Sequence, residues 1–334
     1  MAPGRAVRGT VLALAAFVAA ACAGPSPQKV HGSQSVTTTT TAPVAVTATQ
    51  AAWRLPAPLT RPAVTASGTR IFLLGGLTKS DTSTASVLEV DPATGRTTAV
   101  GTLALAVHDA AATLVASTPT VFGGGGARTV DVVQAFVGAT ARATGRLPQP
   151  RSDLAAAVVN GTTFVAGGFD GRALVRDVVA TSDGSHFRAA GQLSQGVRYP
   201  AIAVVGSGVW VVGGQTGTTE GANGTEVDLI QRIDSRSGAV SVVGHMPQPL
   251  AHAMAFVLGD HLYVAGGRTS AGAVDTIWAV AADGTVTEVG KLPGRRSDAG
   301  VAVVGSTAWL LGGEVTGPTS ALATVVAVAP STSR

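Results

Sequence analysis

Residues 154–168 read LAAAVVNGTTFVAGG, and this stretch contains the pattern that decides the fold. Two short apolar runs flank Asn160-Gly161, and the second run ends at Gly167-Gly168. An Asn-Gly pair between apolar runs is a strong signal for a tight hairpin, because both turn positions need positive φ angles. The stretch therefore predicts two paired strands, at 154–159 and 163–166.

The same pattern recurs along the chain at intervals of 44 to 53 residues. Five further Gly-Gly pairs each follow a β-type run: Gly75-Gly76, Gly123-Gly124, Gly213-Gly214, Gly266-Gly267 and Gly312-Gly313. Turn signals such as Asp183-Gly184 add a third and a fourth strand to each unit. Six units of four short strands predict an all-β, six-bladed β-propeller over residues 45–334, because a radial array protects the sheet edges.

The two ends of this domain predict how the ring is closed. The last unit has strand-like runs at 299–304, 308–311 and 322–328, and it lacks a fourth. Residues 45–54 (AVTATQAAWR) stand before the first unit, at the place of a fourth strand. We therefore expect this N-terminal segment to supply the outer strand of the last blade.

The segments between units carry an aliphatic residue and mostly a proline, as in LPQPRSD (147–153) and LPGRRSD (292–298). Together with the Gly-Gly pairs, these segments resemble the kelch-repeat family, whose members include the central domain of galactose oxidase. The resemblance implies a kelch-type propeller for residues 45–330. The copper site of galactose oxidase does not carry over, since this chain has two tyrosines and one cysteine, Cys22.

The N-terminus has the features of a bacterial export signal. Arg5 and Arg8 precede an apolar run at 11–21, which is too short to span a membrane. The run ends at Cys22 in a sequence that resembles a lipobox, so we expect residues 1–21 to be removed and Cys22 to be lipidated; cleavage to a soluble secreted protein is the alternative. Residues 22–44 are rich in Ser, Thr and Pro and predict a flexible tether.

The composition limits the classes of partner. Hydrophobic residues make up 46 % and charged residues 13 % of the 334 positions, and the net charge of +4 comes with no basic patch. This argues against nucleic-acid binding. No cofactor motif occurs in the domain, so we expect no cofactor and no metal centre. The expected partners are a glycan, a peptide or an envelope protein, with a membrane contact through the lipid anchor alone and a monomeric chain.

One position in each unit collects polar side chains. The residue six places after the aliphatic marker begins the first strand of the unit, at the mouth of the predicted channel. With their neighbours, these positions give the candidate ligand-binding residues: Arg61, Asp109, Arg151, Asp153, Arg198, Tyr199, His252, Arg296 and Asp298. The alternative is that the repeated Arg-x-Asp sequences tie blades together, because repeated residues usually serve the scaffold.

Three functions remain open from the sequence. The first is a non-enzymatic binding module at the cell envelope. The second is a small-sugar mutarotase or epimerase-like enzyme, which the kelch resemblance suggests, with Arg61, His252 and an aspartate in acid–base roles. The third is a structural envelope protein. A cavity of roughly 300–1,000 Å³ at the mouth favours a small ligand, whereas a plugged, apolar mouth favours a protein partner.

Overall fold

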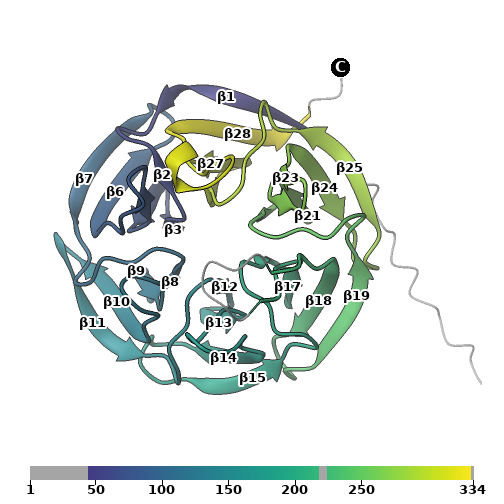
Figure 1. The fold of residues 1–334 in the computed structure, drawn as a ribbon, viewed down its shortest axis with the longest axis horizontal. Coiled ribbons are helices and arrows are strands. Elements are labelled where there is room, and N and C mark those ends of the chain that lie inside the picture. Colours follow the sequence, from purple (N-terminus) through teal and green to yellow (C-terminus); the bar gives the residue numbers. More distant parts are fainter. Residues whose placement is uncertain (1–43, 218–223, 332–334) are drawn as a thin grey trace, which may run out of the picture. The chain divides into compact units, whose positions relative to one another are not determined.

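The computed structural model describes residues 44–217 and 224–331. The regular elements of these residues are strands, apart from a single short 3₁₀ helix, η1 (Pro318–Ser320), among the described positions. The sheets stand around a central axis in a propeller-like arrangement (Figure 1). Within the described residues, no helix has the length and apolarity needed to cross a membrane.

Four of the sheets have four antiparallel strands each. In the list that follows, the strands of the first three sheets run from the axis outward, and those of the fourth sheet run from the rim inward. Their strands are β12 (Ala155–Val159), β13 (Thr162–Ala166), β14 (Asp177–Thr181) and β15 (Arg188–Gln192); β16 (Ala201–Val205), β17 (Gly208–Val212), β18 (Leu229–Asp234) and β19 (Val240–His245); β20 (Met254–Leu258), β21 (His261–Ala265), β24 (Thr276–Val280) and β25 (Val286–Lys291); and β1 (Val46–Arg54), β28 (Thr324–Pro330), β27 (Thr307–Leu311) and β26 (Gly300–Val304).

The remaining large sheet has eight strands, which differs from the six separate four-stranded sheets that the sequence predicts. Its order is β3 (Ala63–Ser67), β4 (Arg70–Leu74), β6 (Ser86–Asp91), β7 (Arg96–Thr102), β11 (Thr140–Arg146), β10 (Val132–Val137), β9 (Thr118–Phe122) and β8 (Ala111–Val115). Its halves meet through one parallel pair, Thr102 with Thr140. Gly101 permits this approach, because a Cβ there would overlap the carbonyl oxygen of Ala139.

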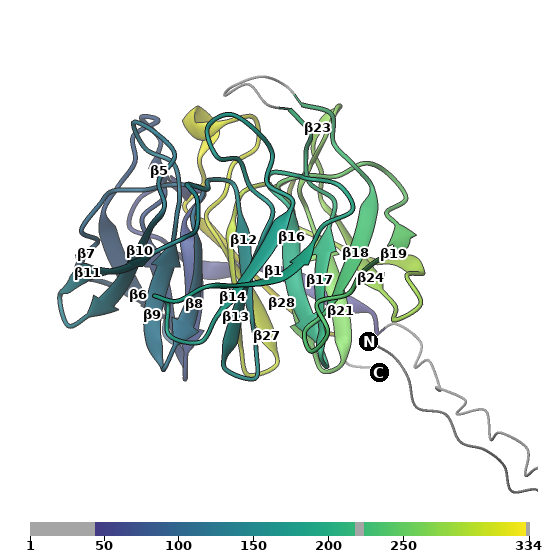
Figure 2. The same cartoon turned by 90° about the horizontal axis from the view of Figure 1, so that it is seen from below.

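Two short two-stranded sheets extend one face of the ring. They are β2 (Leu59–Thr60) with β5 (Leu77–Thr78), and β22 (Arg268–Thr269) with β23 (Gly272–Ala273). Figure 2 shows β5 and β23 on the same side of the molecule, and we call this side the mouth face. The tight turns between the first and second strands of each sheet lie at the opposite face, for example at Asn160-Gly161.

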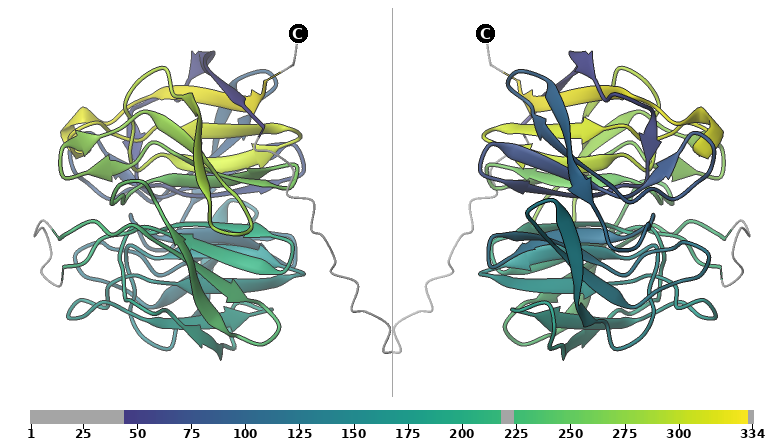
Figure 3. Two further views of the ribbon diagram at one scale, coloured as in Figure 1. Left: turned by 90° about the vertical axis from the view of Figure 1, so that its right-hand side faces the viewer. Right: turned by 90° about the vertical axis from the view of Figure 1, so that its left-hand side faces the viewer.

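The predicted closure of the ring by the N-terminal segment is confirmed. β1 pairs antiparallel with β28, with Val46 opposite Pro330 and Arg54 opposite Thr324. Figures 1 and 3 show β1, in purple, running along β28, in yellow, at the rim. The Trp53 ring packs on Trp309 of β27, with ring centroids 5.6 Å apart. The two ends of the domain are therefore held in one sheet by backbone hydrogen bonds.

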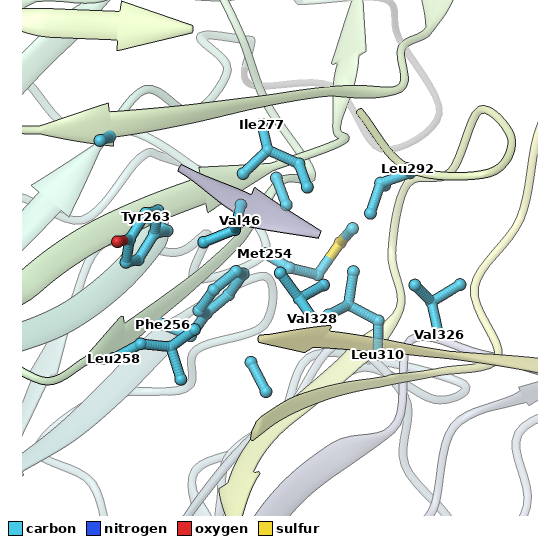
Figure 4. Close-up of a cluster of buried hydrophobic side chains, with 13 residues drawn as sticks. Val46, Met254, Phe256, Leu258, Tyr263, Ile277, Leu292, Leu310, Val326 and Val328 are labelled. Atoms are coloured by element: carbon cyan, nitrogen blue, oxygen red, sulfur yellow. The ribbon is translucent and has the colours of Figure 1, made fainter. Parts of the chain in front are cut away.

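The hydrophobic core is divided among the gaps between neighbouring sheets. The cluster in Figure 4 joins Met254 and Tyr263 from one sheet to Val46, Leu310 and Val328 from the next. Fully burying an aliphatic side chain contributes about 1.5–3 kcal/mol. Most clusters combine side chains from two sheets, and one combines the two halves of the eight-stranded sheet. Neither a four-stranded sheet nor one half of the larger sheet therefore buries its apolar faces alone.

Candidate functional site

Six residues share an unusual backbone conformation at the mouth face. Each lies two positions before an innermost strand and has a left-handed φ between 51° and 57°: Arg61, Asp109, Asp153, Tyr199, His252 and Asp298. They are the six positions that the sequence singles out at the start of each unit. Such angles are uncommon for residues other than glycine, so a common cause must hold all six.

That cause is a closed ring of backbone hydrogen bonds. The N–H of each residue donates to the carbonyl of the one before it, and Arg61 closes the cycle by donating to Asp298 at 2.9 Å. The other five N···O distances lie between 2.8 and 3.3 Å, for Asp109 to Arg61, Asp153 to Asp109, Tyr199 to Asp153, His252 to Tyr199 and Asp298 to His252. We call these six residues the axial ring. The ring brings together side chains that are far apart in sequence.

A cavity of about 630 Å³ lies above the axial ring at the mouth face. Six of the nine candidate residues line it: Arg61, Asp109, Asp153, Arg198, Tyr199 and His252. Asp298 instead lines a smaller cavity of about 140 Å³, which the axial ring shares with the residues that follow it. The sequence thus identifies six of the polar residues that line the larger cavity.

The structure places the other two candidates, Arg151 and Arg296, away from the cavity. Both are buried, and burial lowers the pKa of each to about 10. Arg151 donates to the carbonyl of Asp177 at 2.9 Å, and Arg296 donates to the carbonyl of Thr324 at 2.9 Å. These arginines hold strand ends within their own sheets, whereas the alternative drawn from their repetition was that they tie neighbouring blades together.

Arg61 is the most heavily compensated charge of the site. Its guanidinium lies 3.2 Å from Asp109, 3.2 Å from Glu314 and 3.8 Å from Asp298. Burial opposes the charged form, but the three carboxylates outweigh it and raise the pKa of Arg61 above its usual value. Arg61 therefore stays charged, and its charge is already balanced within the protein.

Asp153 is a carboxyl group with an unusual proton affinity. Burial, followed by the negative charge of Asp109, raises the pKa of Asp153 to about 7 although Arg198 forms an ion pair with it. Arg198 also donates to the Tyr199 hydroxyl at 3.1 Å. Burial and the two aspartates raise the pKa of Tyr199 well above its usual range. Tyr199 is therefore a neutral hydrogen-bonding group in the cavity.

His252 is fixed from three sides. Its Nδ1 lies 2.6 Å from Oδ1 of Asp298, and its Nε2 lies 3.2 Å from Oε1 of Gln215. The Tyr199 ring stacks on the imidazole at 3.9 Å between centroids and 25° between planes. Burial raises the pKa of Asp298, but His252 and Arg61 outweigh burial and lower it well below its usual range. Asp298 is thus an anion that orients the imidazole.

A second layer of side chains lies above the axial ring and is missing from the sequence-based candidates. It occupies the position directly after each Gly-Gly pair, which forms a backbone bridge with the residue before the axial ring. Gln215, Arg268 and Glu314 stand at this position. A comparison of the units in register at this position is the sequence signal that finds them.

Glu314 is the central residue of this second layer. Its side chain is fully buried and accepts hydrogen bonds from Arg268 at 2.9 Å, Arg61 at 3.2 Å and Thr60 at 3.0 Å. Burial, followed by Asp298, raises the pKa of Glu314. Arg268 reaches the cavity wall with 24 % of its side chain exposed. Glu314 therefore links Arg61 to an accessible guanidinium.

The segment 216–225 lengthens the fourth interval between Gly-Gly pairs, and residues 218–223 of it lie outside the described residues. Gly224 and Glu226, which follow residues 218–223 and are described, line the cavity. Among the described lining residues, the arginines and carboxylates are three of each: Arg61, Arg198, Arg268, Asp109, Asp153 and Glu226. The described wall is polar, and these formal charges balance when Asp153 is ionised.

Comparison with known proteins supports the fold. No family model matches the chain, and no curated protein matches it. Among solved structures, that of YjhT superposes with a TM-score of 0.68 and 15 % sequence identity, covering 82 % of this chain and 95 % of that one. The likeness and the arrangement of sheets show that the domain is a β-propeller.

Proposed function

We propose that this protein is a six-bladed, kelch-type propeller that binds a small, hydroxyl-rich ligand in the cavity above the axial ring. The blade number rests on the six ring residues and on the single parallel pair that joins the halves of the eight-stranded sheet. Each half, β3-β4-β6-β7 and β8-β9-β10-β11, then counts as one blade. The kelch assignment rests on the repeated Gly-Gly and Leu-Pro segments.

The observation that carries the binding proposal is the cavity itself. Its volume of about 630 Å³ is typical of small-ligand sites, and convergent polar groups give such sites their specificity. Because the described part of the wall has equal numbers of arginines and carboxylates, a neutral ligand with many hydroxyl groups fits better than a strongly charged one. Arginine and carboxylate side chains together provide both donors and acceptors for hydroxyls.

A thermal-shift screen of the full chain against neutral monosaccharides and disaccharides tests this proposal. A ligand should raise the melting temperature, since binding to the native state stabilises it by mass action. Arg268→Ala should remove most of the shift, whereas Arg146→Ala, on exposed strand β11, should leave it unchanged. A shift that survives Arg268→Ala, Arg61→Ala and His252→Ala would place the ligand elsewhere and reject the site.

A sugar mutarotase or epimerase-like enzyme is the second candidate. The pKa of Asp153, near 7, suits a group that both donates and accepts protons at neutral pH. The sequence predicts acid–base roles for His252 and an aspartate of the ring in such an enzyme, and His252 and Asp153 both line the cavity. Exchange spectroscopy on anomers of the sugars that bind tests it: faster interconversion that is lost in Asp153→Asn favours the enzyme, and an unchanged rate favours the binding module.

We further propose that the protein is exported and anchored through Cys22, with residues 22–44 as the tether. Residues 1–43 lie outside the described residues, so the proposal stands on the sequence alone. The described chain begins at the face opposite the mouth, because Val46 pairs with Pro330 at the far end of β28. The cavity would then open away from the point at which the tether joins. Metabolic labelling with a fatty-acid analogue, with Cys22→Ser as the comparison, tests the anchor.

A further inference from the structure

Ser83, His108 and Asp109 form a chain of contacts, in which His108 and Asp109 line the mouth cavity and Ser83 contacts His108. The Ser83 hydroxyl lies 2.8 Å from Nδ1 of His108. On the other side of the imidazole, Nε2 lies 3.7 Å from Oδ2 of Asp109. Asp109 is in turn held by Arg61 at 3.2 Å. The order is that of a nucleophile, a base and an orienting carboxylate.

The assignment of the two imidazole nitrogens matters for this chemistry. Asp109 faces Nε2 and favours the tautomer that carries its proton there, which leaves Nδ1 free to accept the proton of Ser83. Both contacts are compatible with one neutral imidazole. The spacing of 3.7 Å is loose, as such contacts often are before a substrate binds.

A second group of Ser, His and Asp side chains in the same chain lacks the geometry that would activate its serine. Ser185 and Asp183 both contact Nδ1 of His186, at 3.0 and 2.8 Å. One nitrogen cannot accept a proton from the serine while it donates to the aspartate. The His186 side chain is also 90 % exposed and lies in a turn. The two groups have the same composition, and they differ in geometry and place.

The surroundings of His108 are suited to a substrate. His108 and Asp109 both line the cavity, and the His108 side chain is 21 % exposed. Gly125 stands beside the imidazole, where a Cβ would come within 3.1 Å of Nε2. The absence of a side chain at this position leaves the backbone close to the imidazole and open to the cavity.

We propose that Ser83 is a nucleophile activated by His108, with Asp109 as the positioning residue, and that it cleaves a carboxylic ester carried by the cavity ligand. The Ser83 oxygen bonds to the ester carbonyl carbon as its proton passes to Nδ1 of His108. The ester C–O bond breaks, the alcohol leaves with that proton, and the acyl group stays on Ser83. Water then attacks the acyl carbon, passes a proton to His108 and releases the acid, while Ser83 recovers its proton.

That the substrate is an acylated sugar rests on the proposed function. The reactivity of Ser83 does not depend on it. The test is therefore labelling of the full chain with a fluorophosphonate probe, followed by peptide mass spectrometry. We expect labelling at Ser83, none in Ser83→Ala, and a rate at least 100-fold lower in His108→Ala or His108→Gln. Ser185→Ala, the matched control, should label at the unchanged rate.

Two further measurements separate activation from structure. Hydrolysis of 4-nitrophenyl acetate should depend on Ser83, and the rate per folded molecule should fall about tenfold in Asp109→Asn, with the folded fraction measured by circular dichroism because Asp109 also pairs with Arg61. Failure of the probe to label Ser83, or equal labelling of folded His108→Gln, would overturn the proposal. A negative sugar screen together with Ser83 labelling would instead reject the proposed ligand and keep the nucleophile.

Discussion

The Nδ1 atom of His252 lies 2.6 Å from Oδ1 of Asp298, and the same two residues are joined through the backbone, where the Asp298 N–H donates to the His252 carbonyl at 3.0 Å. A side-chain contact and a backbone hydrogen bond thus both join His252 to Asp298, two neighbouring residues of the axial ring. Both side chains are at least nine-tenths buried. Removing one partner leaves the other desolvated and without its closest contact, which is costly.

A double-mutant cycle between His252→Ala and Asp298→Ala should therefore show strong coupling. We expect a coupling energy of about 1–3 kcal/mol, because contacting residues in one buried network are not additive. The exposed pair His245–Asp228, 3.1 Å apart, is the matched control and should give about 0–1 kcal/mol. Urea denaturation of the wild type and the six variants measures both values. Equal coupling in the two cycles would contradict the importance of burial.

Glu314→Gln should destabilise the fold more than an equivalent change at the surface. Glu314 is fully buried and compensates Arg61 and Arg268, so the neutral amide leaves two guanidinium groups under-compensated. We expect a loss of about 3 kcal/mol in the free energy of unfolding, the lower end of the range for breaking a buried pair. Glu89→Gln, half-exposed and 3.7 Å from Arg70, should cost under about 1 kcal/mol. Similar losses for both would refute the network.

Gly95→Ala and Gly161→Ala separate backbone strain from steric overlap. Their φ angles are nearly equal, 75° and 76°, so both variants carry the left-handed penalty of about 1–2 kcal/mol. A Cβ at Gly95 would overlap the Trp53 ring, whereas no atom lies within 4 Å of one at Gly161. Gly95→Ala should therefore lower the melting temperature further, and it should loosen β1, which carries Trp53. Calorimetry that finds equal melting temperatures would contradict this.

The stability of the fold should decrease as pH rises toward 7 because of Asp153. Its pKa is raised in the folded state to about 7 from 3.8, so the native state binds the proton more tightly than the unfolded chain between these values. The favourable contribution is complete below pH 4 and is lost as pH rises through 7. Asp153→Asn lacks this titration, so the difference in melting temperature between wild type and variant should change between pH 5 and pH 8.

Asp283→Asn is the control for this titration. Hydrogen bonds from Thr285 lower the pKa of Asp283, so its charge is constant between pH 5 and pH 8. The effect of Asp283→Asn on the melting temperature should be the same at both pH values. A pH-independent effect of Asp153→Asn would show that Asp153 is ionised throughout this range.

The fold could be predicted because its determinants are local and repeated. Asn160-Gly161 specifies a hairpin from neighbouring residues, and the Gly-Gly pairs recur in register. The missing fourth strand of the last unit was enough to place residues 45–54 in β1. The merging of two sheets was not predictable, because it depends on how closely Thr102 and Ala139 approach in space.

The sequence predicted where the residues of the candidate site lie, but not what each side chain does there. The repeat register located the axial ring, since each of its residues has the same place in its unit. It also selected Arg151 and Arg296, because sequence spacing does not tell which way an arginine side chain turns. The repeat register did not select Glu314 and Arg268, because their ion pair joins residues of two different blades.

The sequence by itself determined the repeat, the strands and the segment that closes the ring, because hydrogen bonding within a blade and apolar periodicity act over short distances along the chain. Only the tertiary structure decided which charges meet. Arg61 lies near the start of the domain and Glu314 near its end, and they touch because β1 brings the first blade beside the last. Electrostatic compensation acts through space, so the protonation of Asp153 and the orientation of His252 are properties of the closed ring.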